Sequence, residues 1–254
     1  MRPRPFAPTS LVFPASLVAV AVVVLTVCHA LTSPSAAVYR ALVPHTASLP
    51  GMGLVAEIAI LLLIAMFAWA AWSVRGGPYA RISAILTGGV GVVVAYLASE
   101  LVKTVVTEER PCRAEVVLAE CPEVGDWSFP SNHTGIAFGL AAAVGILVPR
   151  LLWAALPVAA LAGAARVLQG AHYPHDVVAG AAWGLLVTVA VAILLNPVTA
   201  TAVRSLATSN PLVAQWIGRP QVAREPAAPH EAGAGTEEDA DTGDAHDRVP
   251  RARW

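Results

Sequence analysis

The sequence contains few charged residues, and this scarcity excludes several classes of protein. Charged residues make up 13% of the 254 positions and hydrophobic residues 56%, so the charged share is about half that of a typical soluble domain. An ordinary cytosolic enzyme is therefore excluded. The formal net charge is -1 and no Lys/Arg-rich run is present, so we expect no nucleic acid as a partner.

Cysteine is also scarce, with three in the chain. Cys28 lies inside an apolar run and is expected to be a small buried residue. Cys112 and Cys121 share one loop, which we place outside the cytoplasm, where a disulfide persists. Such a bridge would brace the segment that carries Arg110, and the alternative is two unpaired thiols.

The apolar residues form long runs, which is the pattern that a bilayer requires. Six runs are long enough, or nearly so, to cross about 30 Å of hydrocarbon at about 1.5 Å per residue. We therefore predict an all-α polytopic membrane protein with six transmembrane helices. The runs cover residues 11–31, 54–74, 82–102, 134–148, 151–168 and 177–195.

The first run permits a second interpretation, a cleaved signal peptide, because Arg2 and Arg4 precede it. Its apolar core is too long for that, so a membrane helix is favoured. Arginines at the ends of the runs all fall on one side, which the positive-inside rule makes cytoplasmic. Both termini are then cytoplasmic, and the loops 32–53, 103–133 and 169–176 face outward. The other arginines behind this assignment are Arg75, Arg81, Arg150 and Arg204.

The composition changes near residue 219. Residues 1–218 hold all the apolar runs and are predicted to form one membrane domain. Residues 219–254 are rich in Ala, Gly, Pro and acids, and they cannot bury enough apolar surface to fold. We predict a disordered acidic cytoplasmic tail there.

Ionisable groups at a membrane boundary cost free energy and are candidates for function. The first group is Lys103, the chain's single lysine, with Arg110 seven residues later. Both side chains would point to one face if the helix continued, and together they would suit a phosphate. The alternative is a pair of snorkelling basic residues that contact Glu100 or Glu108.

The second group opens the fourth run, where Ser131, Asn132 and His133 follow a proline. Free backbone N–H groups, a hydroxyl and an imidazole at a helix N-terminus form an anion site. The alternative is simple capping by Ser131 or Asn132, with His133 incidental.

The third group contains Arg166, His172 and Asp176. Asp176 lies four residues after His172, so its carboxylate could accept a hydrogen bond from one imidazole nitrogen and leave the other free as a nucleophile. The alternative is that Asp176 only caps a helix. His175 lies outside this pattern and is expected to be an exposed loop residue, and the alternative is a hydrogen-bond donor that supports the site residues from behind.

Taken together, these groups resemble the three motifs of the type-2 phosphatidic acid phosphatase superfamily. Those motifs are Lys, six residues, Arg-Pro; Pro-Ser-Gly-His; and Ser-Arg, five residues, His, three residues, Asp. This chain differs at Asn132, which replaces glycine, and at Ala165, which replaces serine and removes one hydroxyl contact to phosphate. Six helices with an outward site also fit the membrane branch of that superfamily.

The resemblance implies a role for each residue. His172 is the nucleophile that forms a phosphohistidine, Asp176 orients it, and His133 is the general acid and base. Phosphate oxygens are bound by the remaining motif residues, and no metal or other cofactor is required. The phosphate-binding set is Lys103, Arg110, Ser131, Asn132 and Arg166.

A phosphate site at the outer membrane boundary selects a substrate whose tail stays in lipid, so the expected partners are a lipid phosphate and the bilayer. The motifs are most similar to those of bacterial undecaprenyl-pyrophosphate phosphatases. One alternative is a phosphatidate or phosphatidylglycerophosphate phosphatase. An alternative of another class is a transporter or binding protein that holds lipid phosphate without hydrolysis. The sequence does not indicate an oligomeric state.

Overall fold

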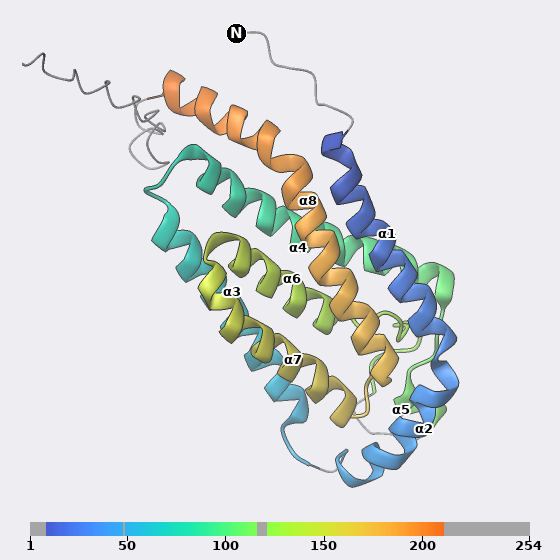
Figure 1. Cartoon of the computed structure of the whole chain (residues 1–254). Helices are drawn as coiled ribbons and strands as arrows, with labels where there is room; N and C mark the ends of the chain where they lie inside the picture. The colour runs from blue at the N-terminus through green and yellow to red at the C-terminus, as the bar shows by residue number, and fades with distance from the viewer. Residues whose placement is uncertain (1–8, 48, 116–120, 211–254) are drawn as a thin grey trace, which may run out of the picture. The chain divides into compact units, whose positions relative to one another are not determined.

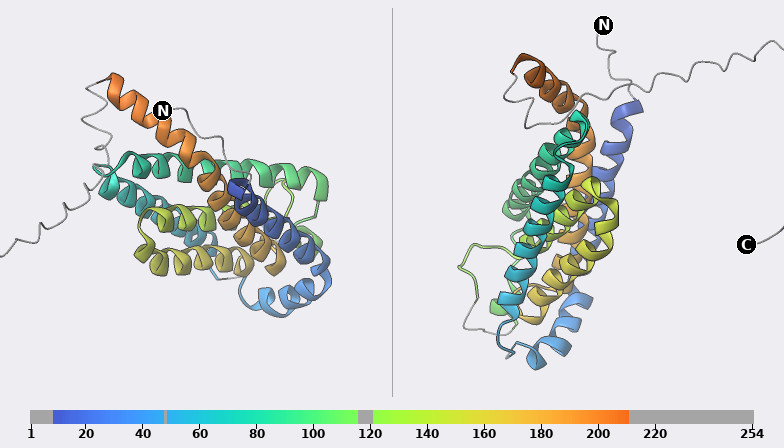
Figure 2. Two further views of the ribbon diagram at one scale, coloured as in Figure 1. Left: turned by 45° about the horizontal axis from the view of Figure 1, so that its top comes forward. Right: turned by 90° about the vertical axis from the view of Figure 1, so that its left-hand side faces the viewer.

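The long apolar runs form helices that lie along a roughly common direction (Figures 1 and 2). The computed structural model describes residues 9–47, 49–115 and 121–210, and these residues contain no strand, as the predicted all-α class requires. The predicted tail from residue 219 lies outside them. The elements are α1 (Thr9–Ala30), α2 (Thr32–Leu42), the 3-10 turn η1 (Val43–His45), α3 (Met52–Val74), α4 (Tyr79–Val106), α5 (Pro111–Ala114), α6 (Asn132–Leu147), the 3-10 turn η2 (Pro149–Leu151), α7 (Leu152–Leu168) and α8 (Pro174–Ser209).

Five helices in the described ranges are long and apolar enough to cross a bilayer, namely α1, α3, α4, α7 and α8. The chain is therefore a multi-pass membrane protein. The fourth predicted run forms α6, whose 16 residues reach about 24 Å, short of the about 30 Å of hydrocarbon. The tight turn expected after it is present as η2.

Helix α8 extends well beyond the predicted end of the last run at residue 195. It continues through Pro197 to Ser209, and the ribbon bends in its C-terminal half (Figure 1). A proline removes one backbone hydrogen bond without ending a membrane helix when neighbouring groups compensate. Next to the proline, the hydroxyl of Ser83 on α4 donates to the Asn196 carbonyl at 2.9 Å, which ties α8 to α4 at this level.

The first predicted outward loop contains a helix, α2, that the apolar runs did not predict. Its face buries Ala36 and Tyr39, which pack with Val43 and Tyr173. The Tyr39 hydroxyl donates to the Gly170 carbonyl at 3.0 Å. Helix α2 therefore supports the turn between α7 and α8.

Helix α8 packs against α1, α4 and α6, and small residues let it approach α4 and α6 closely, as is typical of membrane helices. A Cβ atom at Gly184 would overlap the Gly135 carbonyl of α6, and one at Gly180 would overlap the Ser131 carbonyl. Larger apolar side chains fill the α1 side, where Trp183 packs with Leu25. The glycines of α8 thus set the distance between α8 and α6 and the position of α6 along it.

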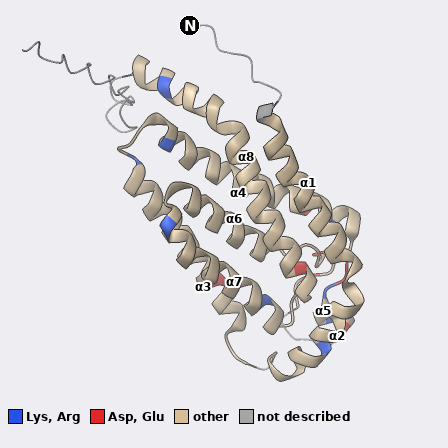
Figure 3. Ribbon diagram, in the orientation of Figure 1, with Lys and Arg blue, Asp and Glu red and all other residues tan. Residues whose placement is uncertain are grey.

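Charged residues lie at the two ends of the helices and are nearly absent between them (Figure 3). One end carries basic residues alone among the described positions, and the other carries both signs (Figure 3). The mixed end holds the loop between α4 and α6 and the turn between α7 and α8.

Candidate active site

The three motifs meet at the mixed end of the helices. Lys103 lies in the last turn of α4, and Arg110 directly precedes α5. His133 lies in the first turn of α6, Arg166 in the last turn of α7, and His172 in the turn before α8. The contacts described below join these segments into one polar site.

The imidazole of His172 is buried and held on both nitrogens. Its Nε2 lies 3.0 Å from Nη1 of Arg110, and its Nδ1 lies 3.3 Å from Oδ2 of Asp176. A guanidinium only donates hydrogen bonds, so Nε2 must accept and the ring proton is on Nδ1, facing the carboxylate. The lone pair on Nε2 therefore faces the cations of the site.

Several effects keep His172 neutral. Burial lowers the pKa of the imidazole well below its ordinary value of 6.5, and the positive charges of Arg110, Arg166 and Lys103 lower it further. A neutral imidazole is the form that acts as a nucleophile.

Asp176 both caps α8 and holds the histidine, so the two interpretations of this residue are not exclusive. Its Oδ2 accepts the Tyr173 backbone N–H at 2.8 Å, which is a capping contact. The same oxygen accepts the hydroxyl of Ser128 and faces His172. Ser128 was missed from the sequence, although it lies three residues before the motif serine.

Lys103 and Arg110 converge on Asp126, but not because the helix continues between them. Helix α4 ends at Val106, and Arg110 has extended backbone. Oδ1 of Asp126 lies 3.2 Å from the Lys103 ammonium and 2.9 Å from Nη2 of Arg110. The expected alternative partner Glu100 also contacts Lys103, at 3.4 Å. Both cations are thus buried and paired in part with acids.

Asp126 itself stays ionised. Burial raises its pKa, but hydrogen bonds and charge from Arg110, together with the charge of Lys103, outweigh burial, and the pKa of Asp126 is lowered. Arg110 also donates through Nε to the Asp126 backbone carbonyl at 2.8 Å. The residue therefore anchors both motif cations.

The start of α6 uses its polar side chains for packing rather than for capping. Ser131 is the N-cap residue but makes no side-chain capping bond, and its backbone N–H donates to the Asp176 carbonyl at 3.1 Å. Asn132 turns toward α4, where it accepts from the Ser99 hydroxyl at 2.7 Å and donates to Glu100. The first backbone N–H groups of α6 have no partner within the helix.

His133 has a carboxylate partner on α3. Its Nε2 lies 2.7 Å from Oε1 of Glu57. Sequence reasoning missed Glu57, although an acid inside an apolar run is itself a sign of function.

Arg166 is buried at the end of α7, next to Ala165. Its Nη1 donates to Gln169 at 2.9 Å, while its buried Nε has no hydrogen-bond partner among the described residues. One guanidinium donor is therefore left for an anion.

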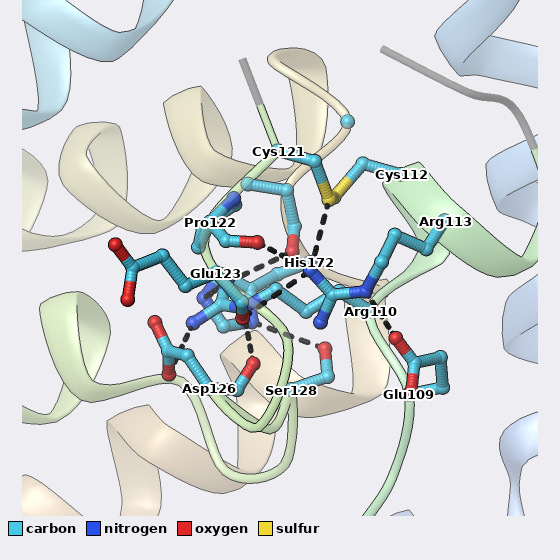
Figure 4. The surroundings of a disulfide bond; sticks show 12 residues. Glu109, Arg110, Cys112, Arg113, Cys121, Pro122, Glu123, Asp126, Ser128 and His172 are labelled. Carbon is cyan, nitrogen blue, oxygen red and sulfur yellow. Dashed lines mark hydrogen bonds and ion pairs between the residues drawn. A yellow bond between two sulfur atoms is a disulfide. The ribbon is translucent and has the colours of Figure 1, made fainter. Parts of the chain in front are cut away.

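A disulfide joins Cys112 and Cys121, with the Cα atoms 5.7 Å apart. Figure 4 shows it beside Arg113, with Arg110 extending from the same segment toward Asp126 and His172. Arg113 contacts Cys121 Sγ at 3.6 Å and also donates to the Pro122 carbonyl. The bridge therefore braces the segment that carries Arg110. The third cysteine, Cys28, is buried and free as expected.

His175 is buried, 3% exposed, so the expectation of an exposed loop residue is wrong. The reason is that the α8 N-terminus is covered by α2 and by the loop before α6. Nε2 of His175 lies 3.0 Å from Oε1 of Glu108 and 3.2 Å from Oδ1 of Asp176. These three residues offer ligand atoms within 4.8 Å of one another, a set that could hold a metal ion.

Residues 84–199 match the PAP2 superfamily, and this stretch includes every motif from Lys103 to Asp176. The chain contains a PAP2 superfamily domain. In the structure this PAP2 domain comprises most of α4, the whole of α6 and α7, and α8 as far as its bend.

Relatives of the PAP2 domain are named as phosphatases of lipid phosphates. Undecaprenyl-diphosphatase of Bacillus subtilis is 35% identical over 92 residues, 36% of this chain and 46% of that protein. Decaprenylphosphoryl-5-phosphoribose phosphatase of Mycolicibacterium smegmatis is 37% identical over 102 residues, 37% of this chain and 51% of that protein. The chain therefore spans about half the length of these curated relatives.

One solved structure is also similar. It is a crystal structure of a transmembrane PAP2 type phosphatidylglycerolphosphate phosphatase from Bacillus subtilis, with a TM-score of 0.49 and 22% sequence identity. The similarity covers 70% of this chain and 94% of that chain.

Proposed function

We propose that this chain hydrolyses a lipid phosphate or pyrophosphate through a phosphohistidine on His172, without a metal ion. The observation that carries the proposal is the pair of contacts on the His172 ring. The guanidinium of Arg110 contacts Nε2, and the carboxylate of Asp176 contacts Nδ1. A phosphate held by Arg110 would have its phosphorus next to the nucleophilic nitrogen.

In the first step, Nε2 of His172 bonds to phosphorus as the bond to the leaving oxygen breaks. His133, positioned by Glu57, donates a proton to that oxygen. Water then attacks the phosphohistidine, His133 takes the water's proton, and inorganic phosphate leaves with the Nε2 lone pair restored. Asp176 stabilises the charged ring in both steps.

The cations take the role that a metal ion has in other phosphoryl transferases. Lys103 supplies a point charge, and Arg110 and Arg166 supply planar donors, including the free Nε of Arg166. The backbone N–H groups at Asn132 and His133 complete the set at the N-terminus of α6, with the Ser131 hydroxyl beside them.

Undecaprenyl pyrophosphate is the substrate that we favour. The undecaprenyl and decaprenyl groups in the names of the two curated relatives support a polyprenyl tail. Phosphatidate or phosphatidylglycerophosphate would present the same phosphate on a diacylglycerol tail.

We further propose that α6 completes a set of six spans, with both termini cytoplasmic and the site outside the cytoplasm. The arginines support this orientation. Arg75 and Arg81 lie at the connection from α3 to α4, Arg150 in η2 and Arg204 near the C-terminus of α8, whereas His172 directly precedes α8. Figure 3 shows basic residues alone at one end of the helices. A disulfide at the site end fits an oxidising compartment.

The test is phosphate release by the detergent-purified full chain in EDTA, from undecaprenyl pyrophosphate, phosphatidate and phosphatidylglycerophosphate. His172→Ala serves as the blank. We expect turnover that is lost in His172→Ala, with undecaprenyl pyrophosphate the best of the three. Lipid phosphate bound by a folded protein without release would instead support a binding protein or transporter.

A further inference from the structure

Behind the His172–Asp176 pair lies a second polar chain that the family motifs do not include. Asp176 uses Oδ2 for His172, Ser128 and Tyr173, and turns Oδ1 to His175 at 3.2 Å. His175 lies 3.0 Å from Glu108, and Glu108 lies 3.4 Å from Nδ1 of His29. The two sides of one carboxylate thus face two histidines.

The ring of His175 is held by two stacked aromatic rings and by a backbone contact. It stacks on Phe129 with ring centroids 5.6 Å apart and on Tyr173 at 5.5 Å. Its backbone N–H donates to the Ser35 hydroxyl of α2 at 3.0 Å. The direction of Nε2 is therefore set by three different segments of the chain.

The proton of His175 follows from what surrounds it. Among the described residues neither ring nitrogen makes a hydrogen bond of good geometry, but Nε2 lies within ion-pair distance of two carboxylate oxygens, which only accept, and Nδ1 does not. The proton therefore belongs on Nε2, where it lies between Glu108 and Asp176. Without that proton the two carboxylates would repel each other in a buried site.

We propose that Glu108 and His175 are positioning residues for the phosphohistidine reaction: Glu108 orients His175, and His175 fixes Asp176 so that Oδ2 stays on Nδ1 of His172. This inference rests on the proposed function. Neither residue touches the phosphate, so each acts on kcat through Asp176. Groups that orient a metal-binding histidine change affinity or activity by about 10- to 100-fold, and we expect an effect of the same size for the oriented nucleophile.

The experiment compares Glu108→Leu, His175→Phe and the double variant in EDTA. His175→Phe keeps the stacked ring and removes the donor. We expect each single variant to lower kcat by about 10- to 100-fold with KM within about twofold of wild type. The double variant should be no slower than His175→Phe, because Glu108 acts through His175.

Two further variants separate positioning from folding. Glu108→Gln keeps an acceptor for His175 and should retain activity within about threefold of wild type. Glu109→Leu is the matched control, since Glu109 is the adjacent acid, is half-exposed and pairs with Arg113 outside the site. It should behave as wild type.

Three outcomes would overturn the proposal. They are kcat values of the single variants within twofold of wild type, additive losses of kcat in the double variant, and an effect on KM alone. Loss of wild-type activity in EDTA would also overturn it, in favour of a metal ion held by Glu108, His175 and Asp176. If no lipid is hydrolysed, the proposed function fails separately, and 15N spectra of the His172 ring decide this inference. Positioning predicts that His175→Phe shifts the Nδ1 signal of His172, and an unchanged signal would contradict it.

Discussion

Nη1 of Arg110 and Nε2 of His172 lie 3.0 Å apart, although the two residues are 62 positions apart in the chain. The same guanidinium donates through Nε to the Asp126 carbonyl and through Nη1 to the Ala171 carbonyl at 3.2 Å. A fork with several fixed donors is required for this arrangement, and an ammonium group does not supply it.

Arg110→Lys should therefore lower kcat/KM by about 100- to 1,000-fold, because it removes donors aimed at the developing charge. The measurement is steady-state phosphate release from undecaprenyl pyrophosphate. Arg40→Lys is the control, since Arg40 forms an exposed pair with Glu115, and it should change little. A loss of less than tenfold in Arg110→Lys would contradict the role given to its fork.

The depressed pKa of His172 has a consequence for stability. Burial and neighbouring cations keep the folded ring neutral below its ordinary value of 6.5, whereas the unfolded chain binds a proton there. The stabilisation is complete above that pH and is lost as pH falls toward the folded pKa. Between about pH 7.5 and 5.5, the melting temperature of wild type should fall more than that of His172→Gln, by at least about 2 °C. Parallel curves would show that His172 is not the titrating group.

Asp126 competes with phosphate for Lys103 and Arg110. Its pKa is lowered, so the carboxylate competes over the whole physiological pH range. Asp126→Asn should lower the inhibition constant of inorganic phosphate about threefold or more, since the Asp126 side chain is 45% exposed and an ion pair of an exposed acid is worth up to about 1 kcal/mol. An unchanged or higher constant would mean that Asp126 supports phosphate binding instead.

The disulfide should matter for catalysis as well as for stability. Replacing both Cys112 and Cys121 by serine should cost about 2–3 kcal/mol of stability and raise KM, because the segment before α5 then holds Arg110 less firmly. Thermal unfolding and KM are measured side by side. Cys28→Ala keeps the bridge and should leave KM unchanged. A bridge-free variant with wild-type KM would rule out the bracing role.

The contact between α6 and α8 depends on a missing side chain. Gly184→Ala places a Cβ on the Gly135 carbonyl, whereas a Cβ added at Gly76 would have no neighbouring atom within 4 Å. Because the added Cβ meets a backbone atom, which cannot rotate away, α6 and α8 must separate. We therefore expect Gly184→Ala to lower the free energy of unfolding by about 1–3 kcal/mol and the melting temperature by several degrees. Gly76→Ala should match wild type, and equal stability of both variants would exclude a tight contact.

The sequence predicted the helical class and the proximity of several motif residues, while the roles assigned to those residues stay predictions. Apolar runs indicate helices directly, and motif spacing brought Lys103, Arg110, His172 and Asp176 into one site. The predicted end of α8 was too early because the apolar run ends at residue 195, whereas the helix continues through Pro197 to Ser209. Helix α2 was missed because its apolar face is short.

Partners from distant elements could not be predicted in the same way. Glu57 reaches His133 across 76 positions and Asp126 reaches Lys103 across 23, and neither spacing is a helical or motif period. The burial of His175 depends on α2 and on the loop before α6, which only the folded chain brings together.

Asn132 stands where the superfamily has glycine, and the structure gives it two bonds to α4 through Ser99 and Glu100. Replacing Asn132 by the consensus glycine would therefore remove both hydrogen bonds between α4 and the first turn of α6. Consensus design is usually stabilising. At this position the consensus residue would be the destabilising one, because the amide of Asn132 has become part of the packing between the two helices.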